Sequence, residues 1–228
     1  MIKAALFDLD GVVFDTESQY TIFWGKIGEE YHPEMPDFAH RIKGQTLVQI
    51  YDKYFSDESA FAHIHGFRDC KDEQAKITAR LDEFEKNMDY IYIPGFEDFV
   101  KDLRQNGVKC AVVTSSNVQK MLNVYERHPE FKSYFDRVLT SEDFAKSKPD
   151  PDCYLKGAEV FGAKPEECVG LEDSFNGLRA VRASGAFTLG LATTNPKEAL
   201  ESYSDYIISD YRGFTFKDLC KIVSVYHK

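Results

Sequence analysis

Short apolar runs alternate with longer amphipathic stretches along most of this 228-residue chain. Six of the runs have the length and composition of buried strands, at residues 2–7, 108–114, 137–140, 168–171, 186–191 and 206–209. Helical periodicity fills much of the chain between and after the later runs, at residues 95–105, 118–127, 151–161, 176–184 and 215–226. Strands that alternate with helices indicate parallel pairing, so the pattern predicts an α/β fold with a Rossmann-like, doubly wound parallel sheet.

One long segment breaks this alternation. Residues 16–91 contain no convincing strand but carry three helical patterns, at residues 18–31, 46–55 and 68–88. A crossover between neighbouring strands rarely needs so much chain. We therefore expect an inserted α-helical domain at residues 16–91 and a catalytic core formed by residues 1–15 and 92–228.

The charge of the chain limits its partners. Lys and Arg number 28 against 38 for Asp and Glu, which gives a net charge of −10. Such an acidic chain lacks the basic surface of a nucleic-acid-binding protein, and it would be repelled by an anionic membrane surface. No apolar run approaches the roughly 18–20 residues that span a bilayer. We expect no nucleic acid and no membrane among its partners, and nothing in the sequence requires more than a monomer.

The cysteines and the first residues bear on location. Five scattered cysteines with no CxxC pair are typical of reduced, mostly buried thiols in a cytoplasmic protein. The chain opens on an apolar run with neither a basic n-region nor a long h-region. These features predict a cytoplasmic protein.

Polar residues follow four successive predicted strands. In chain order they are Asp8 and Asp10, then Thr114, Ser115 and Ser116, then Lys148, and finally Glu172 and Asp173. In open α/β sheets, ligands bind at the carboxyl ends of the strands. Carboxylates, hydroxyls and a lysine at that edge are the groups that a metal-assisted phosphoryl transfer uses.

Each group has a plainer interpretation when it is taken alone. Asp8 and Asp10 fit a solvated turn, and the hydroxyls at residues 114–116 fit the cap of the following helix. Lys148 fits a surface cation, and the acidic pair at residues 172–173 complements a helix dipole. Their joint occurrence at successive strand ends favours a functional site.

These residues also carry a family resemblance. The segment from Asp8 to Glu17 (DLDGVVFDTE) resembles the first motif of the haloacid dehalogenase superfamily. It is most similar to the branch with a small helical cap inserted after that motif, which includes β-phosphoglucomutases and many sugar-phosphate phosphatases. Residues 112–116, 148–151 and 170–174 resemble the second, third and fourth motifs in the same order. The resemblance implies a phosphoric monoester hydrolase whose cap selects the substrate.

The resemblance implies a role for each residue. Asp8 would attack phosphorus and become an aspartyl phosphate, while Asp10 would protonate the leaving oxygen and later activate water. Thr114 would bind the phosphoryl group together with backbone N–H groups at Ser115 or Ser116. Lys148 would bridge the nucleophile and the phosphate.

A magnesium ion is implied as the cofactor. Asp8, the backbone carbonyl of Asp10 and Asp173 would hold it, with waters completing the octahedron. Glu172 is either a further ligand or a residue that supports the ligands. Dehalogenases of the superfamily use no metal and lack the second aspartate of the motif, so Asp10 and Asp173 favour phosphoryl transfer over carbon–halogen cleavage.

The helical segment bears on the choice between mutase and phosphatase. In β-phosphoglucomutases it supplies a Lys-Gly pair, an arginine for the distal phosphate and a histidine. Here Lys43 and Gly44 match the pair, but Leu47 stands near the arginine position and Tyr20 at the histidine position. Because the loss of a bidentate phosphate clamp is not a conservative change, and Arg41 and Arg68 would need a different geometry, hydrolysis is favoured.

We therefore predict a Mg²⁺-dependent phosphatase that acts on a small phosphorylated metabolite, with a sugar phosphate as the leading candidate. The alternatives are a β-phosphoglucomutase-type mutase, an inorganic pyrophosphatase and a non-catalytic protein that binds a phosphorylated ligand. Lys43 is either a substrate contact or a solvated helix-end lysine, and Gly44 would allow close backbone approach. Asp15 is expected at a hinge, Thr16 as a helix N-cap, and Phe23 and Trp24 in the core of the helical segment.

Overall fold

The computed structural model of the chain describes residues 2–43, 45–56 and 70–226. Its centre is a six-stranded sheet with the order β3-β2-β1-β4-β5-β6, and every neighbouring pair is parallel. The strands are β1 (Ala4–Phe7), β2 (Lys109–Val113), β3 (Arg137–Leu139), β4 (Cys168–Glu172), β5 (Phe187–Leu191) and β6 (Tyr206–Ile208). The predicted α/β fold with a doubly wound parallel sheet is confirmed.

Strand β1 lies in the middle of the sheet, and its four residues are all buried. A strand covered on both faces has no polar face, which explains the unbroken apolar run at this point of the sequence. Phe7 is the register partner of Val112 on β2 and of Leu171 on β4. The residues that follow β1, β2 and β4 therefore meet at one edge of the sheet.

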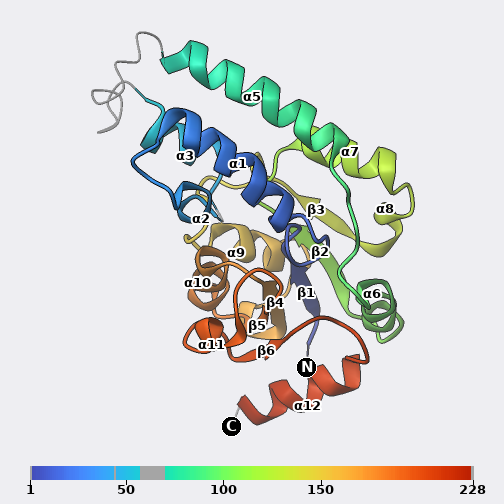
Figure 1. The fold of residues 1–228 in the computed structure, drawn as a ribbon. Helices are drawn as coiled ribbons and strands as arrows, with labels where there is room; N and C mark the ends of the chain where they lie inside the picture. Colours follow the sequence, from blue (N-terminus) through green and yellow to red (C-terminus); the bar gives the residue numbers. More distant parts are fainter. Residues whose placement is uncertain (1, 44, 57–69, 227–228) are drawn as a thin grey trace.

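Helices cover both faces of the sheet (Figure 1). One face packs on α6 (Phe96–Gln105), α7 (Val118–Arg127), α8 (Phe131–Tyr134) and α12 (Phe216–Tyr226). The other packs on α9 (Asp152–Glu159) and α10 (Phe175–Ser184). The alternation of side chains along β1 divides the core accordingly, because Ala5 and Phe7 point to the first layer and Ala4 and Leu6 to the second.

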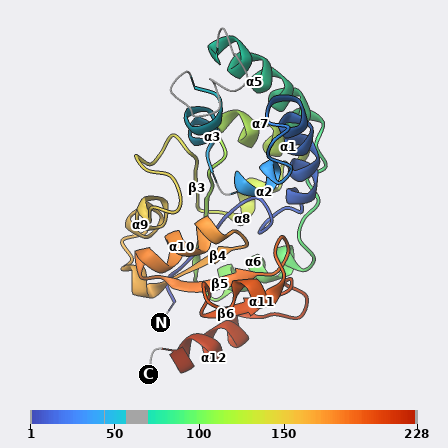
Figure 2. The same cartoon turned by 60° about the vertical axis from the view of Figure 1, so that its left-hand side comes forward.

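A group of helices lies beyond the carboxyl ends of the strands, at the opposite end of the molecule from α12 (Figures 1 and 2). It comprises α1 (Glu17–Tyr31), α2 (Phe38–Arg41), α3 (Leu47–Tyr54) and α5 (Cys70–Asn87). These helices have a hydrophobic cluster of their own, to which Trp24 and partly buried Phe23 belong as expected. The division of the chain into residues 16–91 and the two parts of the core stays a prediction.

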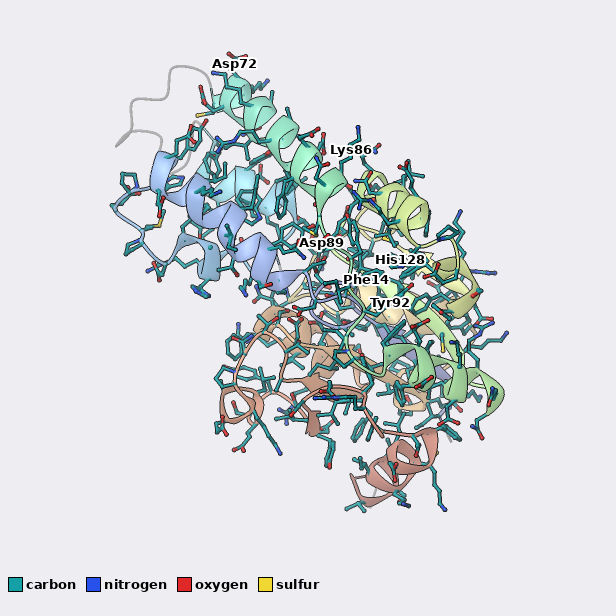
Figure 3. All side chains as sticks on the ribbon, turned by 45° about the vertical axis from the view of Figure 1, so that its right-hand side comes forward. Phe14, Asp72, Lys86, Asp89, Tyr92 and His128 are labelled. Atoms are coloured by element: carbon teal, nitrogen blue, oxygen red, sulfur yellow. The ribbon has the colours of Figure 1, made fainter. Side chains whose placement is uncertain are left out.

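Two strand-like connections join these helices to the sheet. The Asp15 N–H donates to the carbonyl of Ile91 at 2.8 Å, and the Ile93 N–H donates to the carbonyl of Val13 at 2.9 Å. Phe14 stacks on Tyr92 with ring centroids 4.7 Å apart, and both rings contact His128 at the end of α7 (Figure 3). The side-by-side pairing places Asp15 at the junction, where a hinge was expected.

Most element boundaries differ from the sequence-based ranges by one or two residues, and α7 covers the predicted residues 118–127. The short elements α2, α8, α11 (Lys197–Leu200) and η1 (Pro165–Glu167) were not predicted, because three or four residues are too few to show a helical period. Four cysteines are buried and Cys220 is partly exposed. Within the described ranges, no helix combines the length and apolar character needed to cross a membrane.

Candidate active site

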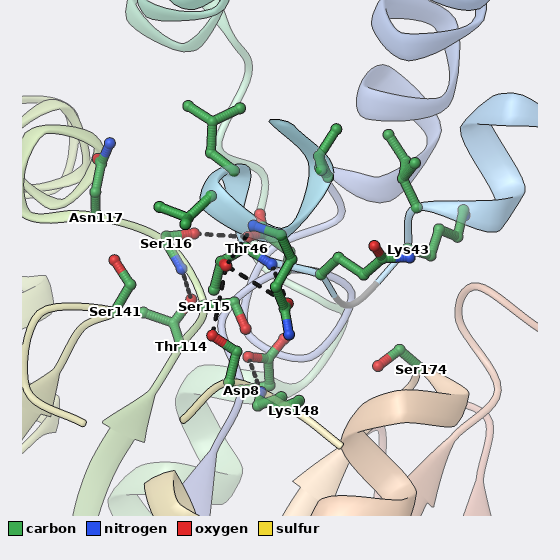
Figure 4. A pocket seen from close by; sticks show the side chains of 18 of the residues that line it. Asp8, Lys43, Thr46, Thr114, Ser115, Ser116, Asn117, Ser141, Lys148 and Ser174 are labelled. Carbon is green, nitrogen blue, oxygen red and sulfur yellow. Dashed lines mark hydrogen bonds and ion pairs between the residues drawn. The ribbon is translucent and has the colours of Figure 1, made fainter. Parts of the chain in front are cut away.

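Lys148 lies at the centre of the polar edge of the sheet (Figure 4). Its ammonium group donates to Asp8 Oδ1 at 2.6 Å, to Glu172 Oε1 at 2.5 Å and to the backbone carbonyl of Val113 at 3.2 Å. Its side chain is only 1% exposed. Burial disfavours the charged ammonium, but Asp8 and Glu172 outweigh this effect and raise the pKa of Lys148. Lys148 is thus a fixed positive charge beside Asp8, not the surface cation of the plainer interpretation.

Glu172 is fully buried and holds Lys148 in place. Its Oε1 also accepts from the Tyr154 hydroxyl at 3.0 Å, and its Oε2 accepts from the Asp173 N–H at 3.1 Å and from the Ser174 hydroxyl at 3.1 Å. A Cβ atom at Gly177 would lie 1.9 Å from the Glu172 carboxylate, so the glycine makes room for it. Both oxygens already have protein donors, which favours a supporting role for Glu172 over direct metal ligation.

Asp8, Glu172 and Asp173 form an acidic cluster, with ligand oxygens within 4.8 Å of one another. Burial raises the pKa of Asp8 to about 7; Lys148 opposes this shift, while Glu172 and Asp10 add to it. Burial also raises the pKa of Asp173, and the charges of Glu17, Glu172 and Asp8 raise it further. One lysine does not balance these carboxylates, and a hard divalent cation with oxygen ligands fits the donor set.

The loop after β5 fixes Asp173. The Thr194 hydroxyl donates to Asp173 Oδ2, and the Asn195 amide donates to the backbone carbonyl of Asp173 at 3.0 Å. Neither residue was singled out from the sequence. Their signal in the sequence is their position just after the predicted strand at residues 186–191, at the same edge of the sheet.

Asp10 is held by a second buried lysine. Lys120 on α7 donates to both carboxylate oxygens of Asp10, at 2.6 and 2.5 Å, and its side chain is 1% exposed. The hydroxyls of Thr16 and Ser116 donate to the same carboxylate. Lys120 was missed, and its one signal was weak: it precedes the inward-facing Met121 on an amphipathic helix.

Thr16 occupies the N-cap position of α1, as expected. In the described structure its side chain makes no capping hydrogen bond, because the hydroxyl is turned to Asp10 instead. The hydroxyls at residues 114–116 likewise do not cap α7, since Asn117 does so by accepting from the Lys120 N–H at 2.9 Å. The hydroxyls of Thr114 and Ser115 are therefore available to the site, while that of Ser116 donates to Asp10.

Thr114, Ser115 and Ser116 line the pocket beside Asp8 (Figure 4). Thr114 Oγ1 accepts from the Ser116 N–H at 3.0 Å, which tightens the turn between β2 and α7. Among the described residues, Ser115 Oγ is one of few buried side-chain oxygens without a hydrogen-bond partner. A buried hydroxyl of this kind is an available donor for an anion at the end of β2.

A cavity of about 1180 Å³ separates this polar floor from helices α1 and α3. Lys43 lines it and pairs with Glu17 Oε2 at 3.0 Å, and both side chains are largely buried, at 17% and 19% exposure. The Lys43 carbonyl accepts from the Asn176 amide of α10 at 3.3 Å. The interpretation of Lys43 as a solvated helix-end lysine is therefore not supported, whereas Gly44 lies outside the described residues.

No arginine of the described ranges lines this cavity. Arg41 pairs with Asp37 at 2.8 Å on the exposed side of α2, and Arg68 lies outside the described residues. Leu47 lines the cavity, and the Tyr20 hydroxyl donates to Glu85 Oε1 at 2.7 Å. The arginine and histidine positions of the mutase pattern are thus filled by an apolar side chain and a paired phenol.

A parallel sheet with paired aspartates, hydroxyls, a buried lysine and a further aspartate at four strand ends defines the haloacid dehalogenase class of hydrolases. The family model of the haloacid dehalogenase-like hydrolases matches residues 2–185, and the chain belongs to this family. The family resemblance inferred from the sequence is confirmed.

Curated relatives extend over most of the chain. A β-phosphoglucomutase of Bacillus subtilis is 27% identical over 207 residues, which cover 86% of this chain and 85% of that protein. A phosphatase of phosphorylated carbohydrates from Thermotoga maritima is 27% identical over 192 residues, which cover 81% and 82%. The chain is thus similar to both a mutase and a phosphatase at the same level of identity.

Solved structures share the fold. A family IA haloacid dehalogenase hydrolase of Entamoeba histolytica aligns with a TM-score of 0.79 and 19% identity, covering 98% of this chain and all of that one. A β-phosphoglucomutase of Clostridium difficile aligns with a TM-score of 0.73 and 22% identity, covering 99% of each chain. At these identities the likeness shows the fold alone.

Proposed function

We propose that this hydrolase is a Mg²⁺-dependent phosphatase that cleaves a small phosphorylated metabolite, a sugar phosphate or a related polyol phosphate. The observation that carries the proposal is the position of Lys148. It bridges Asp8 and Glu172 beside an acidic cluster, at the floor of a cavity lined by hydroxyls. This arrangement offers a nucleophile, a cation for phosphate charge and oxygen ligands for a metal within a few ångströms.

In the first step, Asp8 attacks phosphorus, and the bond between phosphorus and the leaving oxygen breaks as an aspartyl phosphate forms. Asp10 gives its proton to the leaving oxygen, so the product leaves as a neutral alcohol. Lys148 and the residues at 114–116 bind the phosphoryl oxygens throughout. Lys148 donates to Asp8 Oδ1, so Oδ2 receives no hydrogen bond from this lysine.

In the second step, water attacks the phosphorus of the aspartyl phosphate. Asp10 accepts a proton from this water, phosphate leaves and the Asp8 carboxylate is restored. Asp10 thus finishes the cycle in the protonated state that the next cycle requires. The same carboxyl group serves both steps because the proton that it gives up in the first step is regained in the second; the carboxylate accepts from Lys120, Thr16 and Ser116.

Asp8, the backbone carbonyl of Asp10 and Asp173 would hold Mg²⁺, and Glu172 would position Lys148 and the loop that carries Asp173. A bound Mg²⁺ supplies positive charge that offsets repulsion between the Asp8 carboxylate and the phosphoryl group. The raised pKa values of Asp8 and Asp173 support this assignment, because a nearby cation favours the ionised form of both.

We further propose that residues 16–91 form a cap that closes over the substrate and selects it. Two connections that meet at Asp15 and Ile91 join these helices to the sheet, and their own hydrophobic cluster lets them move as a unit. Closure would remove water from the cavity during phosphoryl transfer.

Hydrolysis is favoured over isomerisation by the charge of the cavity wall. A mutase must hold a bisphosphate intermediate at both ends, whereas the wall opposite Asp8 offers Lys43 already paired with Glu17. No arginine among the described lining residues is available for a second phosphate. The printed names of the relatives include both activities, so the sequence likeness alone does not decide between them.

A substrate screen tests the proposal. The full chain would be incubated with Mg²⁺ and a panel of sugar phosphates, polyol phosphates and pyrophosphate, with free phosphate and isomeric products measured together. We expect phosphate release from a phosphomonoester by the wild type and none by Asp8→Asn. Sustained formation of glucose 6-phosphate from β-glucose 1-phosphate and catalytic bisphosphate would establish the mutase instead. No Mg²⁺-dependent release across the panel would leave a binding protein.

A further inference from the structure

Lys120 is a buried charge that the proposed chemistry does not use directly. It belongs to α7, a helix that packs against α5 (Figure 1). Its side chain is 1% exposed, and its ammonium group donates to both carboxylate oxygens of Asp10. A buried ammonium group is costly unless it is fully paired, so this contact is a strong constraint on both side chains.

Neighbouring side chains restrict the orientation of the Lys120 side chain. Its ammonium group lies 4.5 Å from the ring centroid of Tyr20, within the range of a cation–π contact. The Tyr20 hydroxyl donates to Glu85 Oε1, and the Tyr90 hydroxyl donates to the Glu85 carbonyl at 2.8 Å. Tyr20 of α1 therefore lies against the lysine, and Tyr20 is itself held by Glu85 of α5.

Asp10 has no comparable anchor of its own. It follows β1 in a turn, and its carboxylate is 15% exposed to the cavity. Thr16 and Ser116 each donate one hydrogen bond to it, whereas Lys120 contacts both oxygens. An acid that must reach the leaving oxygen needs its carboxyl group held to within fractions of an ångström.

We propose that Lys120 is the positioning residue of Asp10: it touches neither substrate nor metal and acts on the reaction by holding the acid/base carboxyl in place. The inference rests on the proposed phosphatase function. It predicts that loss of Lys120 slows only the steps in which Asp10 transfers a proton.

Two aryl phosphate esters distinguish proton donation by Asp10 from the other steps of the reaction. The phenolate of p-nitrophenyl phosphate departs without a proton, whereas the more basic phenolate of phenyl phosphate benefits from an acid. Because kcat/KM covers the steps up to leaving-group departure, it isolates the acid step from hydrolysis of the aspartyl phosphate. We expect Lys120→Met to lower kcat/KM for phenyl phosphate at least about tenfold and for p-nitrophenyl phosphate less than about threefold.

A double-mutant cycle shows whether Lys120 acts through Asp10. Asp10→Asn should reproduce the selective loss on phenyl phosphate, and adding Lys120→Met to Asp10→Asn should cause no further loss. Lys120→Gln, which keeps a neutral N–H donor group but loses the charge, should fall between wild type and Lys120→Met. Gln119→Met is the matched control, because it changes an exposed residue of the same helix and should leave both esters unchanged. Circular dichroism and thermal unfolding would establish that each variant folds.

Equal losses on the two esters, or losses that multiply in the double variant, would overturn the proposal. If the wild type hydrolyses neither ester, its best substrate from the screen replaces phenyl phosphate, and the cycle with Asp10→Asn still decides. If the wild type releases phosphate from no compound in the screen, the proposed phosphatase function is rejected, and the proposed role of Lys120 is rejected with it. If the wild type is a phosphatase and Lys120→Met leaves kcat/KM unchanged for both esters, the positioning role alone is rejected.

Discussion

Gly11 and Asp173 share a space that has room for only one side chain. A Cβ atom at Gly11 would lie 2.1 Å from Asp173 Oδ2, and Gly11 itself has φ +72. The glycine after the two aspartates thus does more than allow a left-handed turn. It lets the carboxylate of Asp173, the residue after β4, approach the carboxyl end of β1, where the acidic cluster forms.

Gly11→Ala should therefore damage the metal site as well as the turn. We expect it to weaken Mg²⁺ binding and to lower kcat/KM at least about tenfold, since Asp173 must move away from Asp8. Gly213→Ala is the matched control, because Gly213 has φ +70 but nothing within 4 Å of an added Cβ. Both variants should lose about 1–2 kcal/mol of stability from the backbone conformation. Equal Mg²⁺ titrations for the two variants would contradict this account of Gly11.

Asp173 and Glu172 should respond differently to loss of charge. Asp173→Asn should raise the Mg²⁺ concentration needed for half-maximal activity, because it removes a proposed ligand. Glu172→Gln should lower kcat with little change in that concentration, because both oxygens of Glu172 are already occupied by protein donors. Magnesium titrations of the two variants side by side make the distinction. A large rise in the Mg²⁺ requirement of Glu172→Gln would identify Glu172 as a ligand.

Breaking the Lys148–Glu172 pair should also lower stability. Glu172→Gln leaves a buried ammonium group with one carboxylate partner in place of two, and we expect a loss of about 3 kcal/mol. Tyr154→Phe removes only the hydrogen bond from the phenol to Glu172, which is worth about 1–2 kcal/mol. Urea unfolding of both variants provides the comparison. The ranking is rejected if Tyr154→Phe proves the more damaging of the two.

The Glu17–Lys43 pair should determine how well the cavity binds a substrate that carries a second phosphate. Glu17→Gln leaves Lys43 without its counter-charge and removes a negative charge from the cavity wall. We expect KM for a sugar bisphosphate to fall severalfold, with a smaller change for the matching monophosphate. Lys43→Met should leave the bisphosphate KM no lower than in the wild type. An identical preference in wild type and Glu17→Gln would remove this pair from substrate selection.

The sequence was sufficient to locate the floor of the site. Asp8, Thr114, Lys148 and Asp173 were found because apolar runs mark the strands, and parallel strands bring their carboxyl ends to one edge. Thr194 follows the next strand, at residues 186–191, and was not among the predicted residues. The register of β1 with its two neighbours then accounts for the proximity of the motifs in space.

The wall of the site was not predictable in the same way. Lys120 on α7 meets Asp10 in the segment after β1, and helical periodicity does not specify which residues outside the helix its side chains will contact. Tyr20 and Glu85 are far apart in the sequence, and nothing local marks them as partners. The Glu17–Lys43 pair likewise depends on how α1 packs against the loop after α2.

Covalent phosphorylation of Asp8 is the central claim, and acid-quench mass spectrometry tests it most directly. Asp10→Asn would be mixed with p-nitrophenyl phosphate and Mg²⁺, quenched in acid within one turnover, and digested for peptide mapping. This variant can form the aspartyl phosphate from an ester that needs no acid, but it breaks the intermediate down slowly. We predict a phosphoryl group on the peptide that contains Asp8, and none after the further change Asp8→Asn. Release of p-nitrophenol in a burst with no phosphorylated peptide, or with the phosphoryl group at another residue, would contradict the account.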